Sequence, residues 1–229
     1  SFDRHNFSYY AGLEGDLSDK LSLGLAARYE DYSDFGSTTT WKVTSRYAFT
    51  DKVALRGTVS TGFRAPSLQQ QYFQSTSTNF IGGVPYDIVT FRVNNPAALA
   101  LGSEPLKAEE STNYSLGLVL QPIDSLYITI DGYQIGVDDR ITLSENLTST
   151  AVRNYLNANG FPGVGGGRYF TNAIDTTTTG VDIIGTYTWA LEASTLDLTF
   201  GYNYNKTEID SVTPNPAALT AIDPTAVRF

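Results

Sequence analysis

The sequence contains no cysteine, no methionine and a single histidine, His5. Without cysteine, the chain has neither a disulfide framework nor a thiolate metal site. One histidine near the N-terminus makes a catalytic triad or a histidine-based zinc site implausible. We therefore expect no enzymatic activity, no cofactor and no metal. Methionine is missing even at position 1 and no signal peptide is visible, so we expect a processed chain or a fragment.

Charged residues are scarce, at 17% of the chain against about 25% in typical soluble domains. The net charge of −9 argues against nucleic acid as a partner, because nucleic acid requires a basic surface. No apolar run reaches 18 residues, which excludes a transmembrane helix. The alternating strands of a membrane barrel average to a mild hydropathy, so that class stays open.

Aromatic residues are abundant, and apolar side chains alternate with small or polar ones along much of the chain. The clearest case follows a polar turn at 50–52. There Val53, Leu55 and Val59 fall on one face of a strand, and Arg56 falls on the other. This strand has about 12 residues, which is long enough to cross a bilayer, since a tilted strand needs about 9–11.

Eight strands are predicted from this alternation, at about 6–17, 21–32, 40–49, 53–64, 108–120, 126–141, 178–189 and 195–205. Three longer segments are predicted as loops, at about 65–104, 142–175 and 206–229. Short and long connections alternate along the chain, which places the short turns at one rim and the long loops at the other. Outer-membrane barrels have this asymmetry, and a soluble sandwich has no reason for it. We therefore predict an all-β fold, an antiparallel up-and-down transmembrane β-barrel.

Four sequence words resemble the barrel of TonB-dependent outer-membrane receptors. They are STGFRAPSLQQQYF (60–73), PLKAEESTNYSLGL (105–118), VDDRITLS (137–144) and FTNAIDTTTTGVDI (170–183). In that family FRAPS closes a strand before a long outer loop, and a strand similar to the second word follows the loop. Ala108 stands where the family usually has proline, and Ser115 where it often has glutamate. Neither departure disturbs the alternation of the strand.

The resemblance implies that residues 1–229 are part of a receptor barrel domain, eight strands of a barrel of about 22. The whole protein would lie in the bacterial outer membrane and take up a scarce nutrient such as a siderophore, cobalamin or a carbohydrate. Its implied partners are outer-membrane lipid, the plug domain of the same receptor, the TonB complex and a small-molecule nutrient. No plug-like region occurs in this sequence. The alternative is a passive porin or a small structural barrel.

Charged residues on the polar faces of the strands would be costly against lipid and suit a wet lumen. We expect Arg28, Lys42, Arg56 and Asp131 to face the lumen. The opposite residues are expected to face lipid: Leu23, Val43, Val59, Leu116, Ile128, Ile183 and Leu198. The apolar residues of the strand at 126–141 stand at even positions up to 130 and at odd positions from 133, which predicts a β-bulge near Gly132.

The loop at 65–104 contains few charges and many amide and aromatic side chains. Its candidate ligand-binding residues are Gln70, Tyr72, Phe73 and Tyr86. Such groups suit a neutral polyol or sugar, although ordinary surface-loop composition accounts for them equally well. The glycines of 163–167 lack the Lys-Ser/Thr of a phosphate-binding loop and indicate a flexible outer loop.

The last 17 residues contain three prolines and no long alternating run, so we expect them to be another outer loop. The first and last predicted strands would then be open edges with unpaired backbone groups. We expect residues 1–229 to need further strands for a stable membrane barrel.

Overall fold

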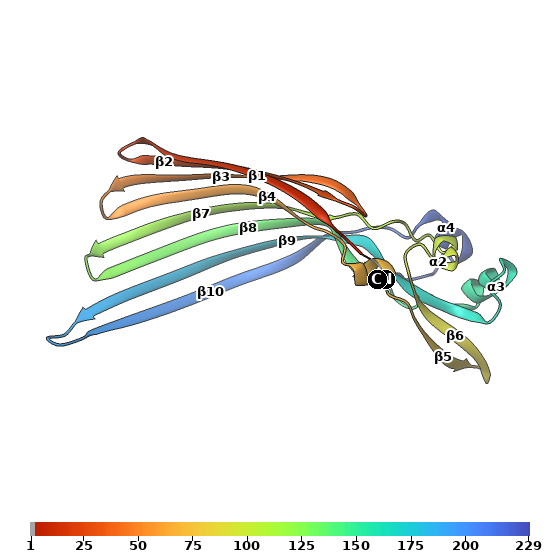
Figure 1. Cartoon of the computed structure of the whole chain (residues 1–229). Coiled ribbons are helices and arrows are strands. Elements are labelled where there is room, and N and C mark those ends of the chain that lie inside the picture. Colours follow the sequence, from red (N-terminus) through yellow and green to blue (C-terminus); the bar gives the residue numbers. More distant parts are fainter. Residues whose placement is uncertain (1–2) are drawn as a thin grey trace.

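The computed structural model describes residues 3–229, and most of them lie in β-strands. Eight long strands lie side by side in one curved wall (Figure 1). They are β1 (Asn6–Ser18), β2 (Leu21–Tyr32), β3 (Gly36–Thr50), β4 (Val53–Arg64), β7 (Glu109–Ile123), β8 (Leu126–Leu143), β9 (Val164–Ala190) and β10 (Thr195–Val212). Successive wall strands pair antiparallel in this order. The expected all-β, antiparallel class is confirmed. Within residues 3–229 the wall is open, with β1 and β10 as its edges.

The connections of the wall differ at its two ends. Tight turns join β1 to β2, β3 to β4, β7 to β8 and β9 to β10 at one end of the strands (Figure 1). The long connections all leave from the opposite end. This is the distribution that the alternating loop lengths predict. No helix within residues 3–229 is both long enough and apolar enough to cross a membrane.

The long connections fold together into a compact structure that we call the cap, formed by residues 65–107, 144–169 and 213–229. Its elements are α1 (Leu68–Tyr72), β5 (Ser75–Ile81), β6 (Val84–Phe91), α2 (Pro96–Ala100), α3 (Thr150–Ala158), the start of β9 and α4 (Ala217–Ile222). The strands β5 and β6 form a hairpin, and β6 runs parallel to the start of β9. The 27-residue β9 therefore belongs to both the wall and the cap.

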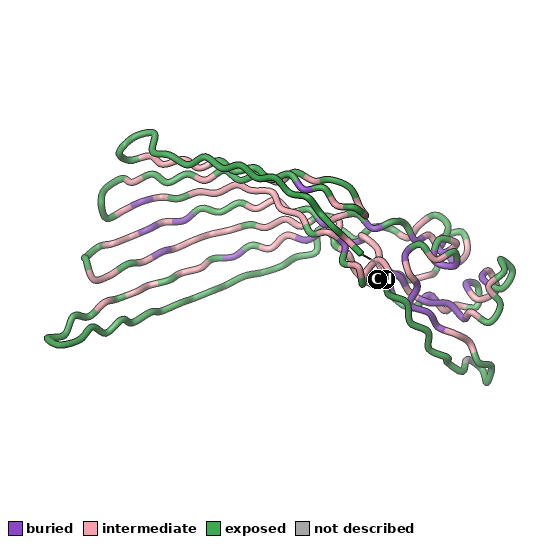
Figure 2. Tube along the Cα trace, viewed as in Figure 1, coloured by how far each residue is buried: buried purple, intermediate pink, exposed green. Residues whose placement is uncertain are grey.

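The hydrophobic core of the molecule lies in the cap and not behind the wall (Figure 2). Its buried residues are Val89, Phe91, Ala97, Ala98, Leu101, Leu147, Val152, Leu156, Tyr169 and Leu219. By contrast, every residue of β1 and of β10 is exposed, because each of these strands has a neighbour on one side only. A single sheet with two open faces has nowhere to bury its apolar side chains, so most of them remain exposed.

The cap corrects our expectation for residues 163–167. The segment is not a flexible loop: after a turn at Gly163 it starts β9 at Val164, and Gly165, Gly166 and Gly167 are buried. An ideal Cβ on Gly167 would lie 2.0 Å from the carbonyl oxygen of Val89, and one on Gly166 would lie 2.0 Å from that of Leu147. Backbones approach this closely only where no side chain intervenes. The glycines are there for close packing and not for flexibility.

Two strand boundaries also differ from the prediction. β9 begins at Val164, well before position 178, because its first residues pair with β6 and the next ones with β8. β10 continues past position 205 to Val212, paired throughout with β9. The segments 65–104 and 142–175, predicted as loops, also contain helices and strands. Their sequences show no clear alternation of apolar and polar residues.

The predicted bulge near Gly132 is wrong. The pairing of β7 with β8 runs without a shift from Glu110↔Asp138 to Leu120↔Ile128. The irregularity lies between Val137 and Ile141, in the pairing with β9. There Asp139 adopts a φ of 56° and its N–H donates to Asp175 Oδ1 at 2.9 Å. Aspartate tolerates this left-handed conformation better than most residues. After Asp131 the apolar residues lie on the opposite face of the same regular strand, and the register does not shift.

The register sorts the wall residues onto two opposite faces. Arg28, Lys42, Arg56 and Asp131 share one face, which we call the polar face. Leu23, Val43, Val59, Leu116, Ile128, Ile183 and Leu198 share the other, the apolar face. The division follows from the period of two along each strand and from antiparallel pairing, which keeps directly opposed residues on the same face.

Candidate site at the junction of wall and cap

The end of β4 and the start of β7 are joined by an ion pair at the level where the chain leaves the wall for the cap. Arg64 Nε donates to Glu109 Oε2 at 2.7 Å, and Arg64 Nη2 donates to the other carboxylate oxygen. The N–H of Ile141 on β8 donates to Glu109 Oε1 at 2.8 Å. Glu109, a residue only 6% exposed, thus accepts hydrogen bonds through its carboxylate from both neighbouring strands. Two of the four sequence words, those with FRAPS and KAEES, meet in this pair.

A second polar contact fixes α1 against the connection between β2 and β3. Arg4 Nη2 donates to Asp34 Oδ2 at 2.7 Å and to the Pro66 carbonyl oxygen at 2.6 Å. Gln71 Nε2, on α1, donates to Asp34 Oδ2 at 3.2 Å. The Arg4 guanidinium also lies 5.4 Å from the ring centre of Phe35. One aspartate therefore joins the N-terminal segment, the β2–β3 connection and the first helix of the cap.

These contacts set the ionisation of Asp34. Its partial burial acts to raise the pKa of the carboxyl group. The hydrogen bonds and positive charge of Arg4, together with the Gln71 amide, act in the opposite direction and prevail. The pKa of Asp34 is thus held below its usual value. Asp34 is therefore a carboxylate at neutral pH, and its charge is matched by that of Arg4.

A cavity of about 300 Å³ lies beside this contact. Five separate segments line it: the β2–β3 connection, α1, the residues after β6, α2 and the residues before β7. Its lining residues are Asp34, Phe35, Gln71, Tyr72, Val93, Asn94, Leu99, Pro105 and Leu106. Cavities of 300–1,000 Å³ with mainly apolar walls and a few polar groups are typical of small-molecule sites, and this one is at the lower limit. We take it as the candidate site.

The structure separates the four residues predicted to bind a ligand. Tyr72 lines the cavity. Gln70 lies on α1 two positions before Tyr72, but its side-chain oxygen accepts from the N–H of Ser67 in a capping box at the helix start. Phe73 ends the helix and is 49% exposed. Tyr86 lies on β6, where its ring contacts Arg153 of α3 at 5.5 Å.

The remaining residues of the cavity carry little signal in the sequence. Asp34 and Phe35 sit in a short polar link, and Asn94, Leu99 and Leu106 sit in a stretch without periodicity. Their proximity depends on how the cap folds. The run of glutamines before Tyr72 is the feature that points toward this place, since Gln71 lines the cavity and holds Asp34.

The polar face of the wall carries an ion pair that spans three strands. Arg56 on β4 donates to Asp131 on β8 through Nε at 2.9 Å and Nη2 at 2.6 Å. Between them lies Gly117 of β7, which pairs with both residues. An ideal Cβ on Gly117 would lie 2.0 Å from Asp131 Oδ1. The missing side chain therefore gives the pair room to form. Lys42 and Arg28 lie on the same face, and Arg28 pairs with Glu30 at 2.8 Å.

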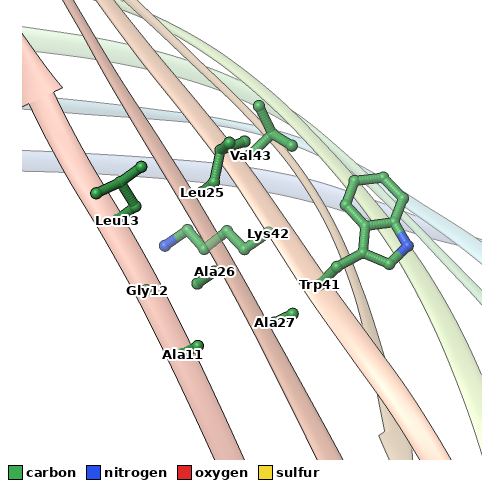
Figure 3. A pocket seen from close by; sticks show the side chains of 9 residues that line it. All are labelled: Ala11, Gly12, Leu13, Leu25, Ala26, Ala27, Trp41, Lys42 and Val43. Carbon is green, nitrogen blue, oxygen red and sulfur yellow. The ribbon is translucent and has the colours of Figure 1, made fainter.

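The apolar face has a shallow recess over β1, β2 and β3. Leu13, Leu25 and Val43 form a row across the three strands, and Trp41 lies beside them (Figure 3). Ala11 and Ala27 leave the space between these larger side chains. The recess offers contact to an apolar medium, and among the residues named here only Trp41, through its indole N–H, could donate a hydrogen bond on that face. It is therefore a poor candidate for recognising a polar small molecule.

Comparison with known proteins identifies the architecture. A model of the family described as TonB dependent receptor-like, beta-barrel matches residues 1–226. The probable TonB-dependent siderophore receptor PirA of Acinetobacter baumannii is 26% identical over 146 residues, which are 62% of this chain and 18% of that protein.

Solved structures show the same fold. The siderophore receptor PirA from Pseudomonas aeruginosa superposes with a TM-score of 0.65 at 17% identity, covering 91% of this chain and 35% of that chain. The RagAB peptide importer superposes with a TM-score of 0.62 at 14% identity, covering 91% of this chain and 22% of that chain. The 229 residues thus span a minor part of these proteins. Since the family model matches almost every residue of the wall and the cap, the chain belongs to the TonB-dependent receptor family, within its β-barrel.

Proposed function

We propose that these residues form part of the wall and outer rim of a bacterial outer-membrane receptor for the active uptake of a scarce small-molecule nutrient. The observation that carries this proposal is the difference between the two ends of the wall. One end has only tight turns, and the other carries a cap with its own core and a cavity. In outer-membrane barrels short turns face the periplasm and long loops face the outside. The cap is then placed where a nutrient arrives.

The two faces of the wall fit the same placement. The apolar face would meet lipid, because its seven assigned positions carry aliphatic side chains, and no charge has to be transferred from water to hydrocarbon at these positions. The polar face, with the Arg56–Asp131 pair, would meet the lumen, which in the resembled family holds the plug. The open edges at β1 and β10 would pair with further strands of the full receptor. We propose about 22 strands for its complete barrel.

Spin labels test this assignment of faces. We expect a label at position 43 (Val43→Cys) of the full receptor to be relaxed mainly by oxygen dissolved in lipid. A label at the adjacent position (Lys42→Cys) should be relaxed mainly by an aqueous nickel chelate. The two residues are neighbours on β3 and differ in the face they occupy, so each label is the control for the other. The opposite pattern would mean that the two faces are exchanged between lipid and lumen.

The nutrient class proposed for the full receptor is a siderophore, supported by the relatives described as siderophore receptors. In this proposal the plug and its contact with TonB lie elsewhere in the receptor, and the wall performs no covalent chemistry. The alternative is a passive pore. The two differ in their need for energy, because only active uptake concentrates a nutrient against its gradient.

Uptake measurements separate them. The full receptor, expressed in cells that lack their own siderophore receptors, should support accumulation of radiolabelled iron supplied as a ferric siderophore. Deleting tonB should reduce this uptake to the level of cells without the receptor. Accumulation that is unaffected by the deletion and rises linearly with external concentration would establish the passive pore instead. Outer-membrane insertion in both strains, checked by surface labelling, is the control.

A further inference from the structure

The cavity beside Asp34 has a composition that restricts the molecule it can hold. The inference below rests on the proposed function, since it assigns a chemistry to the outer site of the same receptor. Much of the wall of the cavity is apolar: Phe35, Val93, Leu99, Pro105 and Leu106 line it. Val93 and Leu106 are nearly buried, at 8% and 9% exposure, whereas Leu99 is 48% exposed and lies at the open side. Apolar walls of this kind fit the flat face of a ring.

The polar groups of the cavity include both hydrogen-bond acceptors and amide donors. Asp34 Oδ1 accepts from Arg4 Nε, which leaves it one acceptor position. Gln71 donates its amide to Asp34, and within residues 3–229 its side-chain oxygen accepts no hydrogen bond. Asn94, which is exposed, has a side chain without a hydrogen-bond partner in the same range. Unused acceptors beside the amide donors of Asn94 favour a ligand whose groups both donate and accept, such as hydroxyl groups.

The charge of the cavity disfavours anions. Among the described residues that line it, the only charged one is Asp34, a carboxylate. The nearby cation, Arg4, is already engaged by both oxygens of Asp34 and by the Pro66 carbonyl. Anionic ligands are usually bound by arginines that are free to form paired hydrogen bonds. A phosphate, sulfate or carboxylate placed here would face Asp34 without such a partner.

We infer that this cavity binds one uncharged ring that carries hydroxyl groups, of the sugar or phenol type, as a free molecule or as part of the transported one. The ring lies against the apolar wall, and its hydroxyls donate to Asp34, Gln71 and Asn94. The volume of about 300 Å³ matches one ring and not several. Anions are disfavoured because no cation among the described lining residues can receive them, and hydroxyls are favoured because they can pair with both the acceptors and the amide donors of the cavity.

Saturation-transfer NMR on the full receptor in detergent micelles tests this. The probes are methyl glucoside and phenol, with glucuronate and benzoate as their anionic counterparts. We expect signals from the two neutral probes and none from the anions. The variant Leu99→Trp, which places an indole in the opening, should weaken binding by about tenfold or more. Leu191→Trp is the matched control: Leu191 is exposed to a similar degree, 51%, and lies in the β9–β10 turn at the opposite end of the wall.

The variant Asn94→Ala removes an exposed amide without filling the cavity, and should weaken the binding of methyl glucoside more than that of phenol. Anionic probes that bind as well as the neutral ones would overturn the inference. It would also fall if neither neutral probe binds, or if Leu99→Trp and Leu191→Trp bind alike. The uptake assay is scored separately. TonB-dependent uptake without ring binding would reject the cavity assignment alone, and ring binding without TonB-dependent uptake would reject the receptor function alone.

Discussion

Replacing Gly167 by alanine is expected to unfold the cap and to leave the wall intact. An ideal Cβ at this position would lie 2.0 Å from the Val89 carbonyl oxygen and 2.6 Å from Phe91 Cε2. On the other side of Gly167, its carbonyl accepts from the Leu147 N–H at 2.8 Å. The obstacle is backbone on the β6 side, so no rotamer change relieves the clash. Overpacking typically costs about 1–3 kcal/mol, and here β6 must separate from β9.

Hydrogen exchange on the full receptor measures this effect. Peptides from 84–101 and 147–169 should lose protection, while those from β2, β3 and β4 should keep it. Gly185→Ala is the matched control, because Gly185 lies in the same strand and a Cβ there meets nothing within 4 Å. Equal protection of the cap in the two variants would show that the close approach at Gly167 is not needed.

Removing the guanidinium of Arg64 is expected to destabilise the junction of wall and cap. In Arg64→Ala the Glu109 carboxylate, 6% exposed, keeps the hydrogen bond from Ile141 and loses both bonds from arginine. A buried charge that loses its partner costs about 3–5 kcal/mol, and because the Arg64 side chain is 62% exposed we expect a smaller loss of about 1–3 kcal/mol. The melting temperature of the full receptor in detergent should fall accordingly.

Two further variants make this result specific. Lys206→Ala breaks an ion pair with Glu208 in which both side chains are more than half exposed, and it should leave the melting temperature unchanged. Adding Glu109→Gln to Arg64→Ala should restore part of the loss, because a neutral amide costs less to bury than a carboxylate. A melting temperature that responds equally to Arg64→Ala and Lys206→Ala would contradict the role assigned to the junction.

The wall could be predicted closely because its period fixes it. In the segment 53–64 the large apolar residues Val53, Leu55, Val59 and Phe63 all fall at alternate positions, and the structure has β4 at Val53–Arg64. Once each strand has an apolar and a polar face, the pairing of neighbours that keeps those faces together follows. The prediction failed where apolar residues stand on the polar face of a strand. Tyr133, Ile135 and Val137 lie on the polar face beside Asp131. Their apolar side chains suggested a β-bulge, and the pairing of β7 with β8 has none there.

The cap could not be predicted in the same way. Its core residues come from segments far apart in sequence, and none of them repeats at a helical or strand period over more than a few positions. The pairing of β6 with β9 depends on contacts between residues near 88 and residues near 166. The glycines at 165–167 carried the information, but glycine permits both a flexible loop and a close backbone approach. For the same reason the cavity residues other than Gln71 and Tyr72 were not apparent from the sequence.

The double membership of β9 has a consequence for the order of folding. Most pairs in the wall are hairpins between strands that are consecutive in sequence, and such local contacts close at little cost in chain entropy. The parallel pairing of β6 with β9 is not a hairpin, and it closes a long loop from residue 91 to residue 164 that contains β7 and β8. We therefore expect the cap to assemble only after β7, β8 and β9 have come together, and α4, which follows β10, to add its buried Leu219 to the core last. A receptor interrupted during insertion would then present a nearly finished wall with an open outer rim, and the site at that rim would be among the last parts to mature.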